Sequence, residues 1–246
     1  MHRRSSCAFL GTLLAALLLT AACSSSSEPG PLGRAYASLR NRFSSGQSEL
    51  QQAFDAKKAA HSWRTLTLLK MHPGRALETT IEVSCPDREH IVTTLGDAHY
   101  EAIRVGNQAW IRSNDGGWKT QPEAADAYPC GSNPGAPAPW AMMNEGRDPV
   151  SVISTMANKM NAQVGRGELA KVGDTSCQRW VVSFQHPGST GRGLNYTVCI
   201  GIGDHLPREV VMGSGGLVTT YSDWNKPMQI DPPALSANSG EASPAH

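Results

Sequence analysis

Residues 64–120 form a series of short segments in which apolar and polar side chains alternate with a period of two. In segment 76–83, one face carries Leu77, Thr79, Ile81 and Val83. Turn sequences such as Gly106-Asn107 and the NDGG at 114–117 separate the segments. This alternation is typical of strands with one buried face, joined as hairpins. The pattern predicts a meander of six strands at 64–71, 76–83, 85–95, 99–105, 108–112 and 118–120.

The C-terminal half repeats this pattern and predicts five further strands, at 161–172, 177–185, 194–200, 206–213 and 216–224. Two main helices are expected. Segment 48–61 begins with a capping box of Ser48 and Gln51, and segment 148–160 begins with Asp148 as its cap and Pro149 in its first turn. A sheet of eleven antiparallel strands must curl, and these helices are available to cover its concave face.

The remaining segments divide the chain into regions. Residues 23–46 are Ser-rich and Pro-rich at first and then predict a short helix over 34–43. Residues 120–149, rich in Pro, Gly and Ala, predict a long loop between the two groups of strands. Residues 234–246 read as a polar disordered tail. The folded domain is therefore predicted to span 47–233, and no internal repeat stands out.

The N-terminus has the organisation of an export signal. Arg3 and Arg4 precede an apolar run over 8–19, which is too short to span a bilayer. Small residues then lead to Cys23, and this arrangement resembles the bacterial lipobox, although Thr20 stands where the pattern prefers leucine. The resemblance implies cleavage of residues 1–22, acylation of Cys23 and stable membrane anchoring. An ordinary signal peptide with an incidental cysteine is the alternative.

The residue after Cys23 bears on which membrane holds the protein. In enteric bacteria an aspartate at that position favours retention in the inner membrane. Ser24 stands there instead, so the analogy favours the outer membrane, facing the periplasm.

Four cysteines remain in the mature chain, and an even number in an exported protein suggests two disulfides. Folding 177–199 as a hairpin about Gly188 places Cys177 opposite Cys199, close enough to bridge. Cys85 and Cys130 then pair by elimination. Four reduced, buried cysteines are the alternative.

Charge and motifs exclude several functions. The 22 Lys and Arg nearly balance the 21 Asp and Glu, so no electrostatic footprint for nucleic acid is expected. The sequence contains no G-x-S-x-G, S-x-x-K, C-x-x-C or H-E-x-x-H motif. Asp97 and His99 share a face, but two ligands do not make a metal site. We therefore predict no catalytic residues, no metal and no cofactor.

Several segments resemble the LolA/LolB-like superfamily of bacterial envelope proteins, which includes the LppX/LprG lipoproteins and the sensor domain of RseB. They are AFDAKKAAHSW (53–63), VSCPDREHIV (83–92), IRVGNQAWIRSNDGGW (103–118), CQRWVV (177–182), DHLPREVV (204–211) and YSDWNKPMQIDPP (221–233). The resemblance implies a mainly β (α+β) fold: a strongly curved, unclosed antiparallel β-barrel with helices over an apolar cavity. Family members bind acyl chains or lipoproteins in that cavity. The Cys177–Cys199 hairpin and the long 120–149 insert depart from the family pattern.

The interior is predicted to be either hollow or filled with side chains. If it is hollow, the cavity lining for a lipid is predicted to comprise Leu66, Leu68, Ile81, Val83, Ile103, Trp110, Val152, Ile153, Met156, Met160, Trp180, Val182, Tyr196 and Val198. If it is filled, much the same residues, with Ile91 and Val211, form a solid core. Arg112 and Lys119 near Trp118 are candidates for a headgroup contact, although a solvated face is the alternative.

These observations predict a membrane-anchored, noncatalytic envelope lipoprotein that binds a lipid or an acylated protein, in transport or envelope maintenance. One alternative is a sensor of the RseB kind with an envelope protein as its partner. Another is a structural lipoprotein with a filled core.

Overall fold

The structure is a computed structural model, and it describes residues 45–71, 74–121, 130, 149–160, 162–184 and 194–235. The predicted signal peptide, Cys23, nearly all of the 23–46 segment, the interior of the 120–149 loop apart from Cys130, and the tail after residue 235 lie outside the described residues. The helices within these described residues are α2 (Gly46–Ala59) and α4 (Pro149–Met160). The strands are β1 (Ser62–Lys70), β2 (Ala76–Ser84), β3 (Arg88–Leu95), β4 (Ala98–Val105), β5 (Gln108–Ser113), β6 (Lys119–Gln121), β7 (Gln163–Val172), β8 (Thr175–Phe184), β9 (Leu194–Gly201), β10 (Pro207–Met212) and β11 (Leu217–Ser222).

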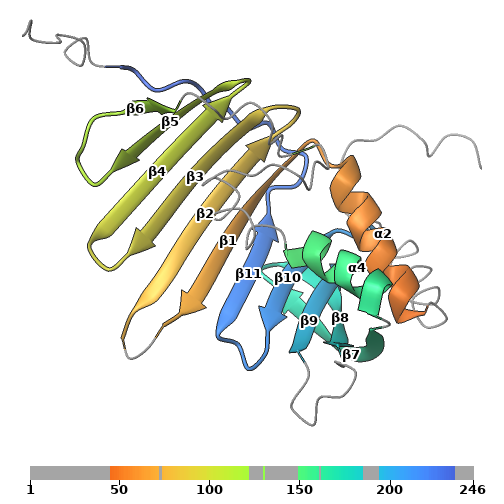
Figure 1. The fold of residues 1–246 in the computed structure, drawn as a ribbon. Helices are drawn as coiled ribbons and strands as arrows, with labels where there is room; N and C mark the ends of the chain where they lie inside the picture. The colour runs from red at the N-terminus through yellow and green to blue at the C-terminus, as the bar shows by residue number, and fades with distance from the viewer. Residues whose placement is uncertain are drawn as a thin grey trace, which may run out of the picture.

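All the described strands belong to one antiparallel sheet, in the order β6-β5-β4-β3-β2-β1-β11-β10-β9-β8-β7. Strand β1 is the first strand of the N-terminal meander, and β11 is the last strand of the C-terminal meander. These two strands pair at the centre of the sheet and join its two halves. Strands β6 and β7 form the two edges, so the described sheet is curved but not closed (Figure 1). The predicted eleven-stranded, unclosed antiparallel architecture is confirmed.

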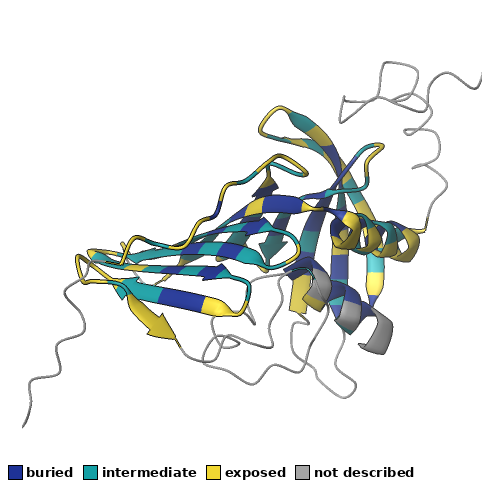
Figure 2. Ribbon diagram, turned by 90° about the horizontal axis from the view of Figure 1, so that it is seen from above, coloured by how far each residue is buried: buried dark blue, intermediate teal, exposed yellow. Residues whose placement is uncertain are grey.

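Both helices lie against one half of the sheet. Helix α2 packs on α4 and β7, and α4 packs on β8 and β10. Figures 1 and 2 show these helices over the β7–β10 half, while β2–β6 extend away from them. Helix α2 begins earlier than the sequence predicts: Ser45, not Ser48, is the N-cap, and its hydroxyl accepts a bond from the Ser48 amide at 3.2 Å. We call the helix-facing side of the sheet the concave face and the other side the convex face.

One row of directly opposed residues crosses the concave face and shows how its burial changes. Residues opposite one another in an antiparallel pair share a face. From β9 to β5 the row contains Val198, Val210, Thr219, Thr67, Thr79, Thr93, Tyr100 and Ser113. The first three are fully buried, the middle three are half-buried, and the last two are exposed. The end of the row that the helices cover therefore carries buried valines. The other end carries exposed polar side chains.

Both predicted disulfides are present. Cys177–Cys199 joins β8 to β9, and Cys85–Cys130 joins the β2–β3 turn to the long loop. The register differs by two residues from the simple hairpin prediction, because Cys199 lies opposite Arg179, and Cys177 lies opposite Gly201. The two cysteines are thus diagonal neighbours, with their Cα atoms 5.4 Å apart.

Candidate functional site

Beneath the helices the concave face is a filled core. Trp180, Val182 and Val198 are each no more than 2% exposed, and Val150 and Ile153 of α4 are equally buried against them. Phe184 meets Tyr196 edge to face, with ring centroids 5.8 Å apart. Side chains packed at this density leave little room for a ligand. In this half of the sheet the filled alternative applies.

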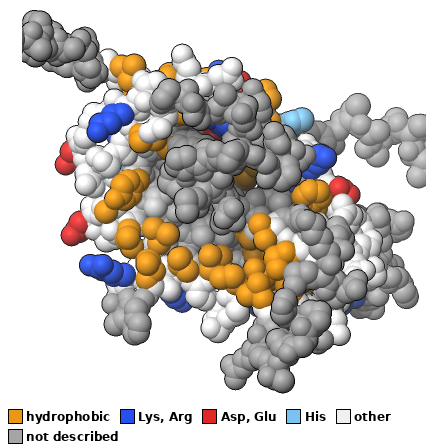
Figure 3. Space-filling model, in the orientation of Figure 1, with side chains coloured by type: hydrophobic (Ala, Val, Ile, Leu, Met, Phe, Trp, Pro, Cys, Tyr) orange, Lys and Arg blue, Asp and Glu red, His pale blue; other side chains and the backbone are white. Residues whose placement is uncertain are grey.

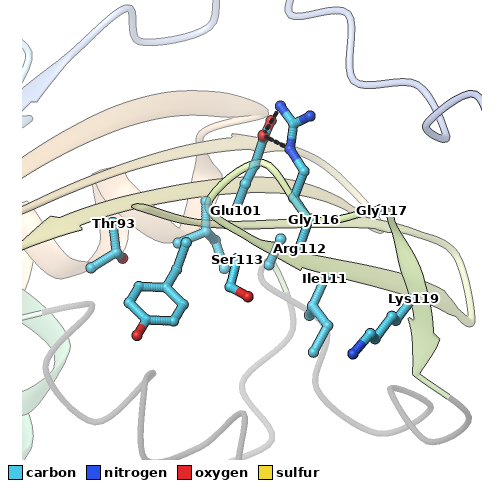
Figure 4. A pocket seen from close by; sticks show the side chains of 11 residues that line it. Thr93, Glu101, Ile111, Arg112, Ser113, Gly116, Gly117 and Lys119 are labelled. Carbon is cyan, nitrogen blue, oxygen red and sulfur yellow. Dashed lines mark hydrogen bonds and ion pairs between the residues drawn. The ribbon is translucent and has the colours of Figure 1, made fainter. Parts of the chain in front are cut away.

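The other half of the concave face carries a cavity of about 300 Å³. Its floor is a row of directly opposed residues, Ile91 on β3, Ala102 on β4 and Ile111 on β5. The next row outward is Thr93, Tyr100 and Ser113, and Gly116, Gly117 and Lys119 lie along the β5–β6 side (Figure 4). Ile91 and Ala102 also belong to the core, so the cavity opens directly from it.

The hollow has a simple steric origin. Ala102 contributes a single methyl group between two isoleucines, and in this half no described helix covers the floor. Hydrophobic side chains also gather along the edge where the β1–β2 and β10–β11 hairpins turn (Figure 3). There the register aligns an apolar row across the sheet, made of Leu95, Leu77, Leu69, Leu217 and Met212. The cavity is thus flanked by half-buried apolar surface.

None of the residues predicted to line a cavity is among the described residues that line this one. Ile81, Val83, Ile153, Trp180, Val182, Tyr196 and Val198 lie in the core, and Met156 packs against it. Val152 is 38% exposed, and the side chain of Met160 lies outside the described part. Most of these residues, which the sequence predicts to line a cavity, therefore form the packed core instead.

Four more of the predicted residues lie on the convex face: Leu66, Leu68, Ile103 and Trp110. The physical reason is the parity of the strands, because neighbours along a strand point to opposite faces. Ile103 and Trp110 oppose each other one position away from the Ala102–Ile111 pair that forms the floor. These apolar side chains cannot face the cavity without a slip in register.

No protein-family model and no curated protein matches the chain. Among solved structures, the lipoprotein LppX of Mycobacterium tuberculosis matches with a TM-score of 0.50 at 18% identity, covering 76% of this chain and 98% of LppX.

The chain has an LppX-like fold.

Other structures match more distantly. The MucA/MucB complex of Pseudomonas aeruginosa gives a TM-score of 0.37 at 12% identity, over 74% of this chain and 56% of that one. A LolA superfamily protein of Nitrosomonas europaea gives 0.27 at 10% identity, over 76% of this chain and 95% of that one. The LppX match agrees with the superfamily fold that the sequence segments resemble.

The convex face of this LppX-like sheet carries a chain of ion pairs across five strands. Lys226 pairs with Asp223 at 2.8 Å, Asp223 with Arg64 at 3.1 Å, and Arg64 with Glu82 at 2.6 Å. His90 lies between Glu82 and Glu101, with its ring nitrogens 3.3 Å and 2.7 Å from their carboxylate oxygens. Arg112 completes the series by pairing with Glu101 and stacking on Trp118, 4.7 Å from the ring centre.

This network lowers the pKa of one of its acids, Glu101. Burial by itself would raise the pKa of Glu101, but hydrogen bonds and charge from His90 and Arg112 outweigh it and hold the pKa below its ordinary value of 4.5. A carboxylate with a depressed pKa stabilises the fold above its unfolded-state pKa, and this stabilisation is lost as the pH falls through the folded-state value.

Replacing Glu101 with glutamine is therefore expected to lower the free energy of unfolding at pH 7 by about 1–2 kcal/mol, because charge-assisted hydrogen bonds to His90 and Arg112 are lost. The difference from wild type should begin to shrink below about pH 4.5, where the Glu101 carboxylate of the unfolded chain takes up a proton, and it should be lost as the pH falls through the lower folded-state pKa. Urea unfolding at pH 7 and pH 3.5 measures both effects. Glu78→Gln, an exposed acid on the same face, is the control and should change little. An equal loss at both pH values would contradict the electrostatic explanation.

The structure separates the two basic residues that the sequence places near Trp118. Arg112 is held on the convex face by Glu101, whereas Lys119 is directly opposite Ile111 and shares its face. Figure 4 shows Glu101 and Arg112 projecting to one side of the sheet and Ile111, Ser113 and Lys119 to the other. Lys119 is the only Lys or Arg among the described lining residues that carries its charge on the concave face.

Within the described residues, no three His, Cys, Asp or Glu side chains are grouped to hold a metal ion. In the same part of the chain, neither helix has the length and apolar character needed to cross a bilayer.

Proposed function

We propose that this protein is a noncatalytic envelope lipoprotein that binds an acyl chain in the cavity over β3–β6. The observation that supports this is the cavity itself: an apolar floor of Ile91, Ala102 and Ile111 in the half of the concave face that the described helices leave uncovered. Well-formed apolar cavities of this size are ordinary sites for small apolar ligands. The LppX-like fold is compatible with this function.

The cavity volume sets the scale of the interaction. A methylene group is close in size to a water molecule, whose share of liquid volume is about 30 Å³, so about 300 Å³ holds roughly ten methylenes. Each one removed from water contributes about 0.8 kcal/mol, or about 8 kcal/mol together. The entropy lost on association offsets part of this, so we expect dissociation constants in the micromolar to sub-millimolar range.

The membrane anchor belongs to the same proposal. Residues 1–22 would be removed, Cys23 acylated, and the 47–233 domain held near the bilayer by the 23–46 segment. Ser24 favours the outer membrane. A tethered protein of this kind receives, holds or presents a lipid or acylated protein within reach of its membrane.

Filling the cavity should abolish binding. Thr93→Trp places an indole in the hollow, and we expect it to weaken the uptake of a fluorescent fatty acid by at least about tenfold. A tenfold loss corresponds to about 1.4 kcal/mol, which is the contribution of about two methylenes, and the indole displaces at least that much of the chain. Fluorescence titration of the full chain measures this. Thr94→Trp is the matched control, since Thr94 adjoins Thr93 but points to the convex face.

A second control separates filling from lost hydrogen bonding. Thr93→Val removes the hydrogen bond between the Thr93 and Thr79 hydroxyls, 3.2 Å apart, without adding bulk, and it should bind like wild type. Binding unaffected by Thr93→Trp, or lost equally in Thr94→Trp, would contradict the assignment. If wild type takes up no fatty acid at all, lipid binding itself fails and a protein partner becomes the better hypothesis.

A further inference from the structure

The cavity has a charged side chain, Lys119, at one end of its apolar floor. Lys119 lies on the edge strand β6, directly opposite Ile111, and is exposed. Its ammonium group takes part in no ion pair or hydrogen bond with any residue that the structure describes. Among the described residues, Lys119 is therefore a cation without a partner at the edge of an apolar hollow.

The other charges near the cavity do not cancel this one. The Glu101 carboxylate is directed to the convex face, where His90 and Arg112 bind it. Arg112 is likewise committed to Glu101 and to the Trp118 ring. The described concave-face lining otherwise consists of aliphatic, threonine, serine, tyrosine and glycine residues, so Lys119 carries the one charge that these residues present to the cavity.

The size of the cavity adds a second restriction. Space for roughly ten methylenes accommodates one chain of medium length and excludes a second chain of the same length. A chain lying along Ile91, Ala102 and Ile111 ends beside Lys119, because Ile111 and Lys119 are directly opposed.

On these grounds, and resting on the proposed function, we infer that the cavity selects a single-chain amphiphile with an anionic headgroup, bound through Lys119. The shared chemistry is one carboxylate or phosphate on one acyl chain, which a free fatty acid and a lysophospholipid both supply. Lys119 acts here as a specificity residue, since the apolar floor contributes equally to charged and neutral chains.

The test is displacement of a fluorescent fatty acid from the full chain by four probes. They are laurate, lauroyl-lysophosphatidylglycerol, the neutral ester monolaurin and the two-chain dilauroyl-phosphatidylglycerol. We expect both single-chain anions to displace the probe more strongly than monolaurin, and the two-chain lipid to displace it least. Lys119→Ala should weaken laurate about two- to fivefold and leave monolaurin unchanged, as for an exposed ion pair. Lys119→Arg should retain binding, and Lys119→Glu should weaken laurate further.

A matched control and the salt dependence complete the experiment. Lys171→Ala removes an exposed lysine from β7, the opposite edge of the sheet, and should leave all affinities unchanged. Raising the ionic strength from 0.01 M to 0.15 M should weaken laurate but not monolaurin. A difference in affinity between laurate and the lysophosphatidylglycerol identifies whether a carboxylate or a phosphate headgroup is preferred. A preference for either one supports the inference.

Failure of the inference differs from failure of the proposed function. Equal binding of laurate and monolaurin, or Lys119→Ala without effect on laurate, overturns the role of Lys119 while leaving acyl binding intact. Strong displacement by the two-chain lipid overturns the single-chain limit. Absence of binding by every probe, including the fluorescent fatty acid, overturns the proposed function.

Discussion

Replacing Trp180 with alanine is expected to lower the free energy of unfolding by about 3–5 kcal/mol, as for other large aromatic side chains removed from cores. Trp180 is 2% exposed and lies opposite Val198, which is fully buried, in the helix-covered half of the sheet. The Arg166 guanidinium lies over its ring, 5.3 Å from the centroid. Removing the indole loses these contacts and leaves a void that the paired strands cannot close.

The matched control is Tyr100→Ala in the uncovered half. Tyr100 is also an aromatic on the concave face, but it is 51% exposed and lines the cavity. Its replacement should change the free energy of unfolding by about 0.5 kcal/mol or less. Urea unfolding of both variants, compared by midpoint and slope, measures the contrast. Similar losses for the two would contradict the division of the concave face into a filled half and an open half.

Removing the β8–β9 disulfide should have the second large effect. The double variant Cys177→Ala/Cys199→Ala is expected to lose about 3 kcal/mol, because the bridge closes a loop of 22 residues and restricts the unfolded chain. Both cysteines are no more than 1% exposed, so lost packing adds to this cost. For a domain of this size the change corresponds to a fall in melting temperature of roughly 6–12 °C.

Thermal unfolding with and without a reducing agent separates the contributions. Reductant should lower the melting temperature of wild type by more than that of the double variant, which retains only Cys85–Cys130. A double variant as stable as wild type under oxidising conditions would show that the Cys177–Cys199 bridge is dispensable.

The sheet could be predicted from the sequence because its turns are local. Gly96-Asp97 and Gly106-Asn107 are two-residue connections, and the strand ends that adjoin these two turns lie within one residue of the predicted bounds. The diagonal placement of Cys177 and Cys199 was not predictable, because the turn between their strands is long and its register is not fixed by residue type.

The residues of β4 and β5 that the sequence predicts to line a cavity lie on the opposite face from the cavity in the structure, and the turns explain why. A two-residue turn at Gly96-Asp97 pairs Leu95 with Ala98, which in turn pairs Ile91 with Ala102. The turn at Gly106-Asn107 then pairs Ala102 with Ile111 and moves Ile103 and Trp110 to the other face. Ile103 and Trp110 are more hydrophobic than Ala102, but it is the small side chain of Ala102 that leaves the hollow.

The extent of helix coverage could not be predicted. The apolar stripes of α2 and α4 indicate that each helix packs against another part of the protein. The periodicity of the stripes does not indicate which strands each helix contacts. The helices pack on β7, β8 and β10, so the cavity lies at the opposite end from Val152, Ile153 and Met156. Cys23 and its anchoring remain a prediction from sequence.

The most direct test of the central claim is to find where an acyl chain binds. A fatty acid carrying a photoreactive diazirine on its chain would be incubated with the full protein, irradiated, and its adducts mapped by peptide mass spectrometry. The account predicts adducts on β3, β4 and β5, at or beside Ile91, Ala102 and Ile111, that are lost in Thr93→Trp and kept in Thr94→Trp. Adducts confined to α4 and the β8–β9 strands, or to convex-face residues such as Leu66 and Ile103, would contradict it.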